Sequence, residues 1–300
     1  MAPETGSRTR RACAAVVLYR PDIPVLAKQA QGLAGVRLFA FANGSLDPGA
    51  LAALAPTDLV LIESAENLGL GHGLNILMEA AREEGFDHVL LLDQDSEPAA
   101  DLIPALSAKA ALLAMAQERV AVVAPLLVPP ESGFYKPIAY HWHGAARPDG
   151  LTPVDFPPTS GSLVDLGAYA EIGRFRDDFF IAGIDVEWGF RAWSKGWSCL
   201  VDSSLSMPHR WGEAASEQER ERPQILRHAP IRNYYYARNV LAVARLPHIP
   251  WGWRLRSCAA LAAQTALVAF LGSRGSLRPV MAGLRDGLKG RLGPAPPDAI

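Results

Sequence analysis

The chain has 300 residues, of which 49% are hydrophobic and 20% are charged, and its formal net charge is −2 at pH 7. This length and apolar content suffice for one large domain or two small ones, and the dispersed glycines and prolines exclude a long disordered tract. Three cysteines without a C-x-x-C pair exclude a disulfide framework or a zinc-thiolate site and favour reduced, cytosolic thiols.

Strands and helices are expected to alternate along the first half of the chain. Short apolar runs predict strands, and longer amphipathic runs bounded by turn residues predict helices. The expected strands span residues 12–19, 36–42, 59–63, 88–92 and 120–125, and the expected helices span residues 23–33, 46–54, 72–84 and 102–118. This alternation predicts an α/β fold in which helices cover both faces of a mostly parallel sheet.

A glycine-rich segment, residues 66–75, joins the third strand to the next helix. Its G-x-G-x-G spacing is not the dinucleotide fingerprint, because Leu74 occupies the position of the last glycine. Two interpretations stay open: the turn offers backbone N–H groups to a phosphate or a sugar, or it is a tight turn that requires positive φ.

Two carboxylates, Asp93 and Asp95, follow the apolar strand at residues 88–92. In an extended backbone they point the same way, at the strand end where open α/β sheets bind ligands. Two like charges so close favour a divalent cation that carries phosphate oxygens. The alternative is a turn in which Asp95 or Ser96 caps the following helix.

A second acidic pair, Asp185 and Glu187, opens a helix that is expected to end near residue 195. Carboxylates in a first helical turn are favoured by the helix dipole alone. The alternative is a general base, because the apolar neighbours Phe179, Phe180 and Trp188 would raise a carboxyl pKa toward neutrality.

Other polar groups are harder to assign. Trp142 stands between two histidines without a third metal ligand nearby, so we expect it to line a sugar site rather than a metal site. His209 is a lone histidine after the strand at residues 198–201. Near Arg232 a helix begins whose face with Tyr235, Tyr236 and Asn239 either holds phosphate or sugar or braces another helix.

The basic residues gather near the carboxyl end. From Arg227 onward eleven basic residues face two acidic ones, so this tail carries +9 and the rest of the chain −11. A basic tail with an interfacial helix suits an anionic membrane surface, and no nucleic-acid-binding signature accompanies it. The apolar residues expected on that helix are Trp251, Trp253, Leu255, Leu261, Leu267 and Phe270. No apolar run reaches the roughly 18–20 residues of a spanning helix.

Six stretches, in the same order, resemble the inverting family 2 glycosyltransferases of GT-A fold, and most closely bacterial rhamnosyltransferases that use dTDP-L-rhamnose. They are VLYRPD at 17–22, ENLG with GLN at 66–75, LLDQDS at 91–96, TSGS at 159–162, DVEW with arginine at 185–191, and YY with RN at 235–239. The resemblance covers residues 12–292. It implies a leader at 1–11, a GT-A (Rossmann-like) catalytic domain at 12–226, and a helical, basic, membrane-associating region at 227–300 on the inner face of the cytoplasmic membrane.

The resemblance also implies a role for individual residues. Asp185 matches the catalytic base and Glu187 a second acidic position, while Asp95 and His209 would hold Mg²⁺ or Mn²⁺. The nucleotide-sugar donor would contact Asn43, Asn67, Gly69, Gly73, Asn75, Asp93 and Arg191. The acceptor, a glycan or lipid-linked oligosaccharide, would contact Trp142, Ser160, Gly161 and Trp188.

Two positions depart from the family pattern. Ala42 stands where the family has an aspartate that contacts the base of the donor, and Ala182 replaces another aspartate. The implied reaction is inverting transfer of L-rhamnose from dTDP-L-rhamnose. Ala42 leaves a UDP-sugar donor open, and the two alanines together leave open a degenerate, non-catalytic sugar-binding protein.

Overall fold

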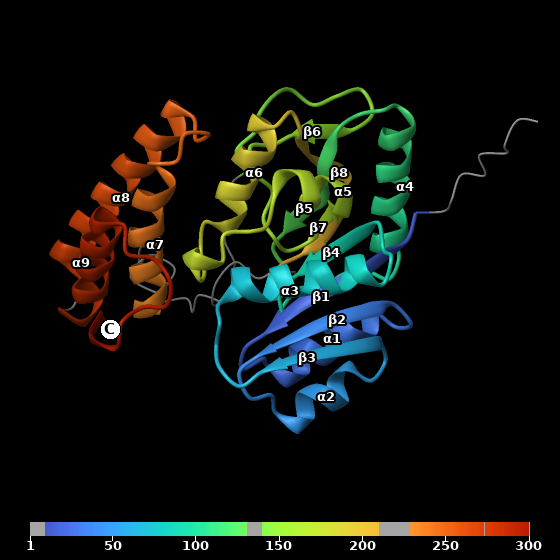
Figure 1. Ribbon diagram of the computed structural model, residues 1–300, viewed down its shortest axis with the longest axis horizontal. Coiled ribbons are helices and arrows are strands. Elements are labelled where there is room, and N and C mark those ends of the chain that lie inside the picture. The colour runs from blue at the N-terminus through green and yellow to red at the C-terminus, as the bar shows by residue number, and fades with distance from the viewer. Residues whose placement is uncertain (1–9, 131–139, 210–228, 273, 300) are drawn as a thin grey trace, which may run out of the picture.

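The computed structural model describes residues 10–130, 140–209, 229–272 and 274–299. Within them, an eight-stranded sheet of order β3-β2-β1-β4-β7-β5-β8-β6 forms the centre of the molecule (Figure 1). The strands are β1 (Ala12–Leu18), β2 (Arg37–Asn43), β3 (Asp58–Ser64), β4 (His88–Leu92), β5 (Val120–Val128), β6 (Leu151–Pro153), β7 (Ser162–Asp165) and β8 (Ser198–Pro208). The leader residues 1–9 and the boundary expected at 226–227 lie outside the described residues.

Strand direction brings several strand ends to one edge of the sheet. β1 pairs in parallel with β2 and β4, β2 with β3, and β5 with β8. β7 lies antiparallel between β4 and β5, so these two strands again run the same way. The carboxyl ends of β1, β4, β5 and β8 therefore meet at one edge, the usual place for a ligand in an open α/β sheet.

Helices cover both faces of this sheet. They are α1 (Ile23–Gly32), α2 (Pro48–Leu54), α3 (Leu70–Glu83), α4 (Leu102–Met115), α5 (Leu166–Ile172) and α6 (Ile184–Ser194). Along β1, Cys13 and Ala15 pack toward α3, α5 and α6, whereas Ala14 and Val16 pack toward α1, α2 and α4. All four side chains are fully buried, as in a strand covered on both faces. The predicted α/β fold with a mostly parallel sheet is confirmed.

Individual elements differ from their predictions. α3 begins at Leu70, so the glycine-rich segment supplies its first turn, and β8 continues to Pro208 instead of ending at residue 201. β6 and β7 were not predicted, because runs of 3 and 4 residues are too short for periodicity to identify. α5 was also not predicted, although its 7 residues equal the length of the predicted α2. Nothing in the sequence of β7 indicates that this strand runs antiparallel to its neighbours.

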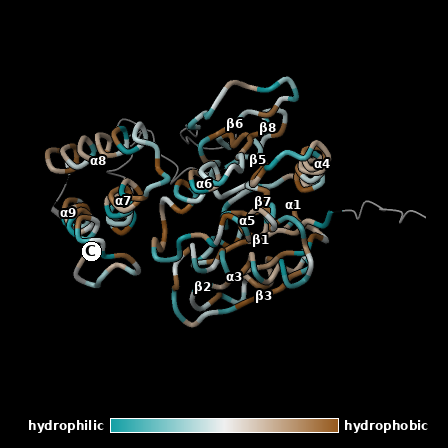
Figure 2. Tube along the Cα trace, turned by 45° about the horizontal axis from the view of Figure 1, so that its top comes forward, coloured by the Kyte–Doolittle hydropathy of each residue, from teal (hydrophilic) through white to brown (hydrophobic). Residues whose placement is uncertain are grey.

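Three further helices end the chain: α7 (Pro230–Val243), α8 (Trp251–Leu271) and α9 (Arg274–Lys289). They pack on one another beside α6 (Figure 1), around a small core that includes Ala237, Leu261 and Val280. Apolar residues recur along α8 although it lies at the margin of the molecule (Figure 2). None of the helices in the described ranges combines the length and apolar character needed to cross a membrane.

Candidate active site

The two carboxylates after β4 sit in a tightly fixed turn. The Asp93 N–H donates to Ser96 Oγ (3.1 Å), and the buried Gln29 amide donates to the carbonyl oxygens of Asp93 (2.6 Å) and Ser96 (3.1 Å). Ser96 Oγ lies 2.5 Å from Ser160 Oγ, which joins this turn to the segment before β7. Neutral hydrogen bonds therefore fix the backbone of the turn that carries Asp93 and Asp95.

His209 completes a cluster with these carboxylates. It follows the last residue of β8, and its N–H donates to the Val128 carbonyl oxygen (2.9 Å). Its Nε2 lies 3.8 Å from Asp93 Oδ2, and one ligand atom from each of Asp93, Asp95 and His209 falls within 4.8 Å of the others. The common edge of β4 and β8 thus unites residues that are 116 positions apart in the chain.

The donor set of this cluster fits a divalent cation. Two carboxylates and one imidazole are ligands that Mn²⁺ and Mg²⁺ accept, and they leave coordination positions for phosphate oxygens. Burial and the neighbouring Asp95 carboxylate raise the pKa of Asp93, while His209 and Arg232 oppose this rise. A bound cation would offset the repulsion between the two carboxylates.

Asp185 is the carboxylate next to this cluster. It lies in the first turn of α6, after Gly183, whose φ of 77° makes it the left-handed residue before the helix. Burial, with a contribution from the Asp93 charge, raises the pKa of Asp185 to about 6, although the Val186 N–H donates to its Oδ1 (2.9 Å) and opposes the rise. A carboxylate with this pKa is ionised at neutral pH and still basic enough to accept a proton.

The segment before Asp185 has an unusual backbone. Phe180 has φ 65° and ψ −62°, and the Ile181 N–H donates to the Phe179 carbonyl oxygen (2.8 Å), which makes a γ-turn of the rare, positive-φ kind. Ala182 also has a positive φ, 68°. Each such residue costs about 1–3 kcal/mol and persists only where its surroundings enforce it.

Glu187 and Arg191 are not brought to the cluster; they pair with each other. The Arg191 guanidinium donates twice to the Glu187 carboxylate (2.9 and 2.8 Å) and also to the carbonyl oxygens of Ile172 and Arg174. His248 Nε2 lies 3.0 Å from Glu187 Oε1. These buried contacts link α6 to the end of α5 and to the connection between α7 and α8.

The glycine-rich segment, residues 66–75, packs closely against other parts of the chain. A Cβ on Gly69 would lie 2.7 Å from the Phe180 carbonyl oxygen, and one on Gly71 would lie 2.5 Å from the Arg176 carbonyl oxygen. A Cβ on Gly73 would meet Phe41 at 2.8 Å. The glycines thus serve close chain packing and, at Gly69, a φ of 88°, which favours the tight-turn interpretation.

The three expected donor-binding asparagines are engaged in internal hydrogen bonds. Asn43 Oδ1 accepts from the Leu68 N–H (2.7 Å), and Asn67 Oδ1 accepts from the Gly69 N–H (3.0 Å). Asn75 is fully buried and bonds to Tyr169 and Phe175. These hydrogen bonds fix the glycine-rich segment within the protein.

Three of the four residues expected on the acceptor side, Ser160, Gly161 and Trp188, lie near one another at the end of β4. Ser160 is paired with Ser96, and the Gly161 N–H donates to the Leu91 carbonyl oxygen (2.8 Å). Trp188 is buried and donates to the Gly173 carbonyl oxygen (2.8 Å), with Asp185 and Trp188 lining the same small cavity. Trp142 is 51% exposed and bridges to Val154, beside the sheet edge formed by β6.

The sequence did not lead us to the residues that hold the turn at Asp93 in place through hydrogen bonds. Gln29 was unremarked in an amphipathic helix, although a polar residue on a buried face signals a specific hydrogen-bond partner. Gln94, between the two aspartates, exchanges hydrogen bonds with the Tyr19 backbone at the end of β1 (2.8 and 3.2 Å). These partners meet only because the strand ends are neighbours in the folded sheet, so the local sequence does not identify them.

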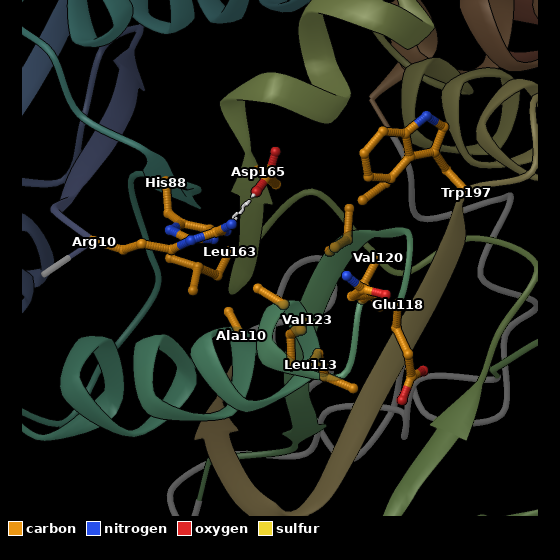
Figure 3. Close-up of a pocket in the computed structure, with 14 residues that line it drawn as sticks. Arg10, His88, Ala110, Leu113, Glu118, Val120, Val123, Leu163, Asp165 and Trp197 are labelled. Carbon is orange, nitrogen blue, oxygen red and sulfur yellow. Dashed lines mark hydrogen bonds and ion pairs between the residues drawn. The ribbon is translucent and has the colours of Figure 1, made fainter. Parts of the chain in front are cut away.

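A cavity of about 230 Å³ lies at the amino-terminal ends of β4 and β5, away from Asp93 (Figure 3). His88 and Val120, the first residues of β4 and β5, line it, together with Asp165, which accepts from Arg10 (3.1 Å). Because His88 and Asp93 bracket β4, this cavity is separate from the aspartate cluster. Its volume is also below the roughly 300–1,000 Å³ of typical ligand pockets.

The geometry can be set beside known proteins. No protein-family model matches the chain. It is similar to a curated dTDP-rhamnosyl transferase, RfbF of Shigella flexneri, with 26% identity over 197 residues, which cover 63% of this chain and 64% of that protein. The match thus spans slightly less than two thirds of that relative.

Solved glycosyltransferases share the fold. One is S. aureus TarS 1-349 in complex with UDP-GlcNAc, with TM-score 0.55, 12% identity, and coverage of 94% of this chain and 81% of that one. Another is GalNAc-T7 with UDP, GalNAc and Mn²⁺, with TM-score 0.52, 13% identity, and coverage of 84% and 55%. The chain therefore has the GT-A fold, and the expected resemblance to glycosyltransferases is confirmed.

Proposed function

We propose that this protein is an inverting glycosyltransferase that moves L-rhamnose from dTDP-L-rhamnose to a hydroxyl group of a glycan or lipid-linked acceptor. The observation that carries the proposal is the meeting of Asp93, Asp95 and His209 beside Asp185 at one edge of a GT-A sheet. The similarity to a dTDP-rhamnosyl transferase supports the choice of donor.

In the proposed reaction, Asp185 is the general base. Its carboxylate takes the proton of the acceptor hydroxyl while that oxygen bonds to C1 of the sugar and the bond from C1 to the diphosphate breaks. The attack comes from the side opposite the leaving group, so the anomeric configuration inverts. The transition state has oxocarbenium character by analogy with glycoside hydrolysis.

The cluster of Asp93, Asp95 and His209 would bind the diphosphate of the donor. Asp95 and His209, with Asp93 adjoining, would hold Mg²⁺ or Mn²⁺, which when bound supplies charge neutralisation for the leaving diphosphate. The neutral hydrogen bonds of Gln29 and Ser96 fix the backbone of this turn without competing for the charge of the carboxylates. Asn43 and Asn67 hold the loop that borders the nucleotide.

Ligand-observed NMR with dTDP- and UDP-sugars, with and without Mg²⁺, tests this proposal. Metal-dependent binding and slow hydrolysis of dTDP-rhamnose alone is the expected result. Binding of a UDP-sugar instead would keep the mechanism and replace the donor, an alternative that Ala42 leaves open and that solved structures of similar fold containing UDP or UDP-GlcNAc illustrate. Absence of binding to every donor by folded protein would favour the non-catalytic alternative.

The proposal includes peripheral binding of the helical region 227–300 to an anionic membrane, with residues 12–226 as the catalytic part. Six large apolar side chains on α8 and α9 are exposed: Trp251, Leu255, Phe270, Leu271, Met281 and Leu288. Arg256 and Lys289 are exposed on the same helices. By contrast, Trp253 and Leu261, which we expected on this surface, are buried in the protein.

The charge available to a membrane is smaller than the tail's sequence indicates. Arg238, Arg245 and Arg254 donate to backbone carbonyl oxygens within the protein. We therefore expect burial of apolar side chains to supply much of the binding energy, at about 1.5–3 kcal/mol for each large side chain.

Liposome flotation tests this part of the proposal. The double variant Trp251→Ser with Leu255→Ser is expected to lose at least about tenfold in affinity for vesicles with anionic lipid. Met115→Ser, which removes an 81% exposed side chain from α4, is the matched control and should bind like the wild type. Equal binding of all three proteins would refute the assignment.

A further inference from the structure

The strained segment before Asp185 is held by the carboxyl-terminal helices rather than by the sheet. Asn239, on α7, is buried, and its amide Nδ2 donates to three carbonyl oxygens of that segment: Phe179 (3.0 Å), Ile181 (2.8 Å) and Ala182 (2.8 Å). One side chain thus bonds on both sides of the γ-turn at Phe180 and reaches the residue before Gly183.

Arg238 adds to the same contact. Its Nε donates to Asn239 Oδ1 (2.8 Å), which fixes the orientation of that amide, and its Nη2 donates to the Phe179 carbonyl oxygen (2.8 Å). The arginine is completely buried, and the charge is surrounded by acceptor oxygens and the ring of Tyr235 (4.8 Å). A buried charge in this arrangement is costly to rearrange, so it rigidifies what it touches.

Aromatic stacking completes the contact from α7. The ring of Tyr235 stacks on Phe180 with centroids 5.0 Å apart and an interplanar angle of 8°. On the other side, the Phe180 carbonyl oxygen accepts from the Leu70 N–H (2.6 Å) at the start of α3. Phe180 is thereby fixed from two directions in a conformation that the backbone alone disfavours.

We propose that Asn239, oriented by Arg238, is a positioning residue for sugar transfer: it maintains the strained 179–183 segment that sets the place of Asp185. This inference rests on the proposed function of Asp185. It assigns α7 to the transfer reaction, in addition to the membrane role proposed for the helices that follow. The sequence left two roles open for this face of α7: binding phosphate or sugar, or bracing another part of the protein. The inference selects bracing, and the braced segment is the one that positions Asp185.

The variant Asn239→Asp isolates this role. It retains the side-chain shape and the acceptor for Arg238, but it replaces the donating amide with an oxygen that faces three carbonyl oxygens. We expect kcat to fall at least about tenfold, a part of the 10²–10⁴ that a general base contributes. The KM for the donor should stay within about threefold, because none of the three bonded carbonyl groups belongs to Asp93, Asp95 or His209.

Tyr236→Phe is the matched control on the same helix. It removes the hydroxyl that hydrogen-bonds to Gln264 on α8 and leaves the hydrogen bonds of Arg238 and of the 179–183 segment in place. It should keep both kcat and KM. If Asn239→Asp does not fold, Asn239→Ser takes its place, because it removes the same amide without adding a charge.

Hydrogen exchange of the peptide that covers residues 177–187 gives a readout independent of activity. Asn239→Asp should exchange at least about tenfold faster there, and Tyr236→Phe should match the wild type. Unchanged kcat, or a kcat loss matched by an equal rise in KM, would overturn the proposal. If the wild type transfers no sugar, the proposed function fails; exchange alone then decides whether Asn239 orders the segment, and equal rates would overturn that too.

Discussion

Replacing Asp185 with asparagine is expected to slow the enzyme and to stabilise the protein. Removing a general base costs about 10²–10⁴-fold in kcat. Stability changes in the opposite direction because burial makes the charged carboxylate unfavourable in the folded state. The asparagine has no charge to bury, and its Oδ1 can still accept the hydrogen bond from the Val186 N–H.

The size of the stability gain follows from the pKa. In the folded protein the pKa of Asp185 rises from 3.8 to about 6. Between these values the folded state retains a proton that the unfolded chain has lost, so stability declines as pH rises through this window. Well above pH 6 the loss is complete and amounts to about 3 kcal/mol, whereas at pH 5 it is roughly half as large.

Urea denaturation at pH 8 and at pH 5 measures this effect. Asp185→Asn should exceed the wild type in stability, and its advantage should shrink by roughly half between pH 8 and pH 5. The exposed Asp101→Asn is the control and should show no such change. An advantage that is independent of pH would refute the buried-carboxylate reasoning. A stabilised variant with unchanged kcat would instead refute the role of Asp185 as base.

Three further predictions concern the surroundings of this residue. Asp95→Ala should abolish metal dependence and weaken donor binding; equal calorimetric heats with and without Mn²⁺ in the wild type would contradict this. Gly69→Ala should lower the free energy of unfolding by at least about 1–2 kcal/mol, since the new Cβ would lie 2.7 Å from the Phe180 carbonyl oxygen. A decrease below about 0.5 kcal/mol, the usual scatter of surface substitutions, would argue against the tight-turn interpretation. Glu187→Ala should cost about 1–3 kcal/mol in unfolding free energy by leaving the partly buried Arg191 without its carboxylate. A loss of kcat without a loss of stability would indicate a catalytic Glu187 instead.

Local patterns in the sequence were sufficient for much of the fold. The apolar run before Asp93 predicted a buried strand, and β4 occupies the predicted residues, 88–92. The alternation of strands and helices predicted the layered α/β arrangement, because each pattern depends on neighbours within a few residues. Sheet order is a different matter: nothing near Asp93 or His209 indicates that β7 and β5 lie between their strands.

Helix geometry explains how the two acidic residues of α6 differ. Successive residues turn by about 100°, so Asp185 and Glu187 point about 200° apart and cannot face one site together. Glu187 and Arg191, four positions apart, are instead neighbours on one face, as their ion pair shows. That pair was readable from the sequence. The partner His248 was not, since it comes from the distant connection between α7 and α8.

The order of the strands has a consequence for how this protein is made. Asp93 emerges early in synthesis, but its partner His209 lies beyond β7, β5 and β8, and contacts of such large sequence separation form late in folding. An amino-terminal fragment that ends before β8 lacks one of the three proposed metal ligands. Affinity for Mn²⁺ would therefore report completion of the whole sheet during refolding, and a nascent chain would acquire it only after most of its length has left the ribosome.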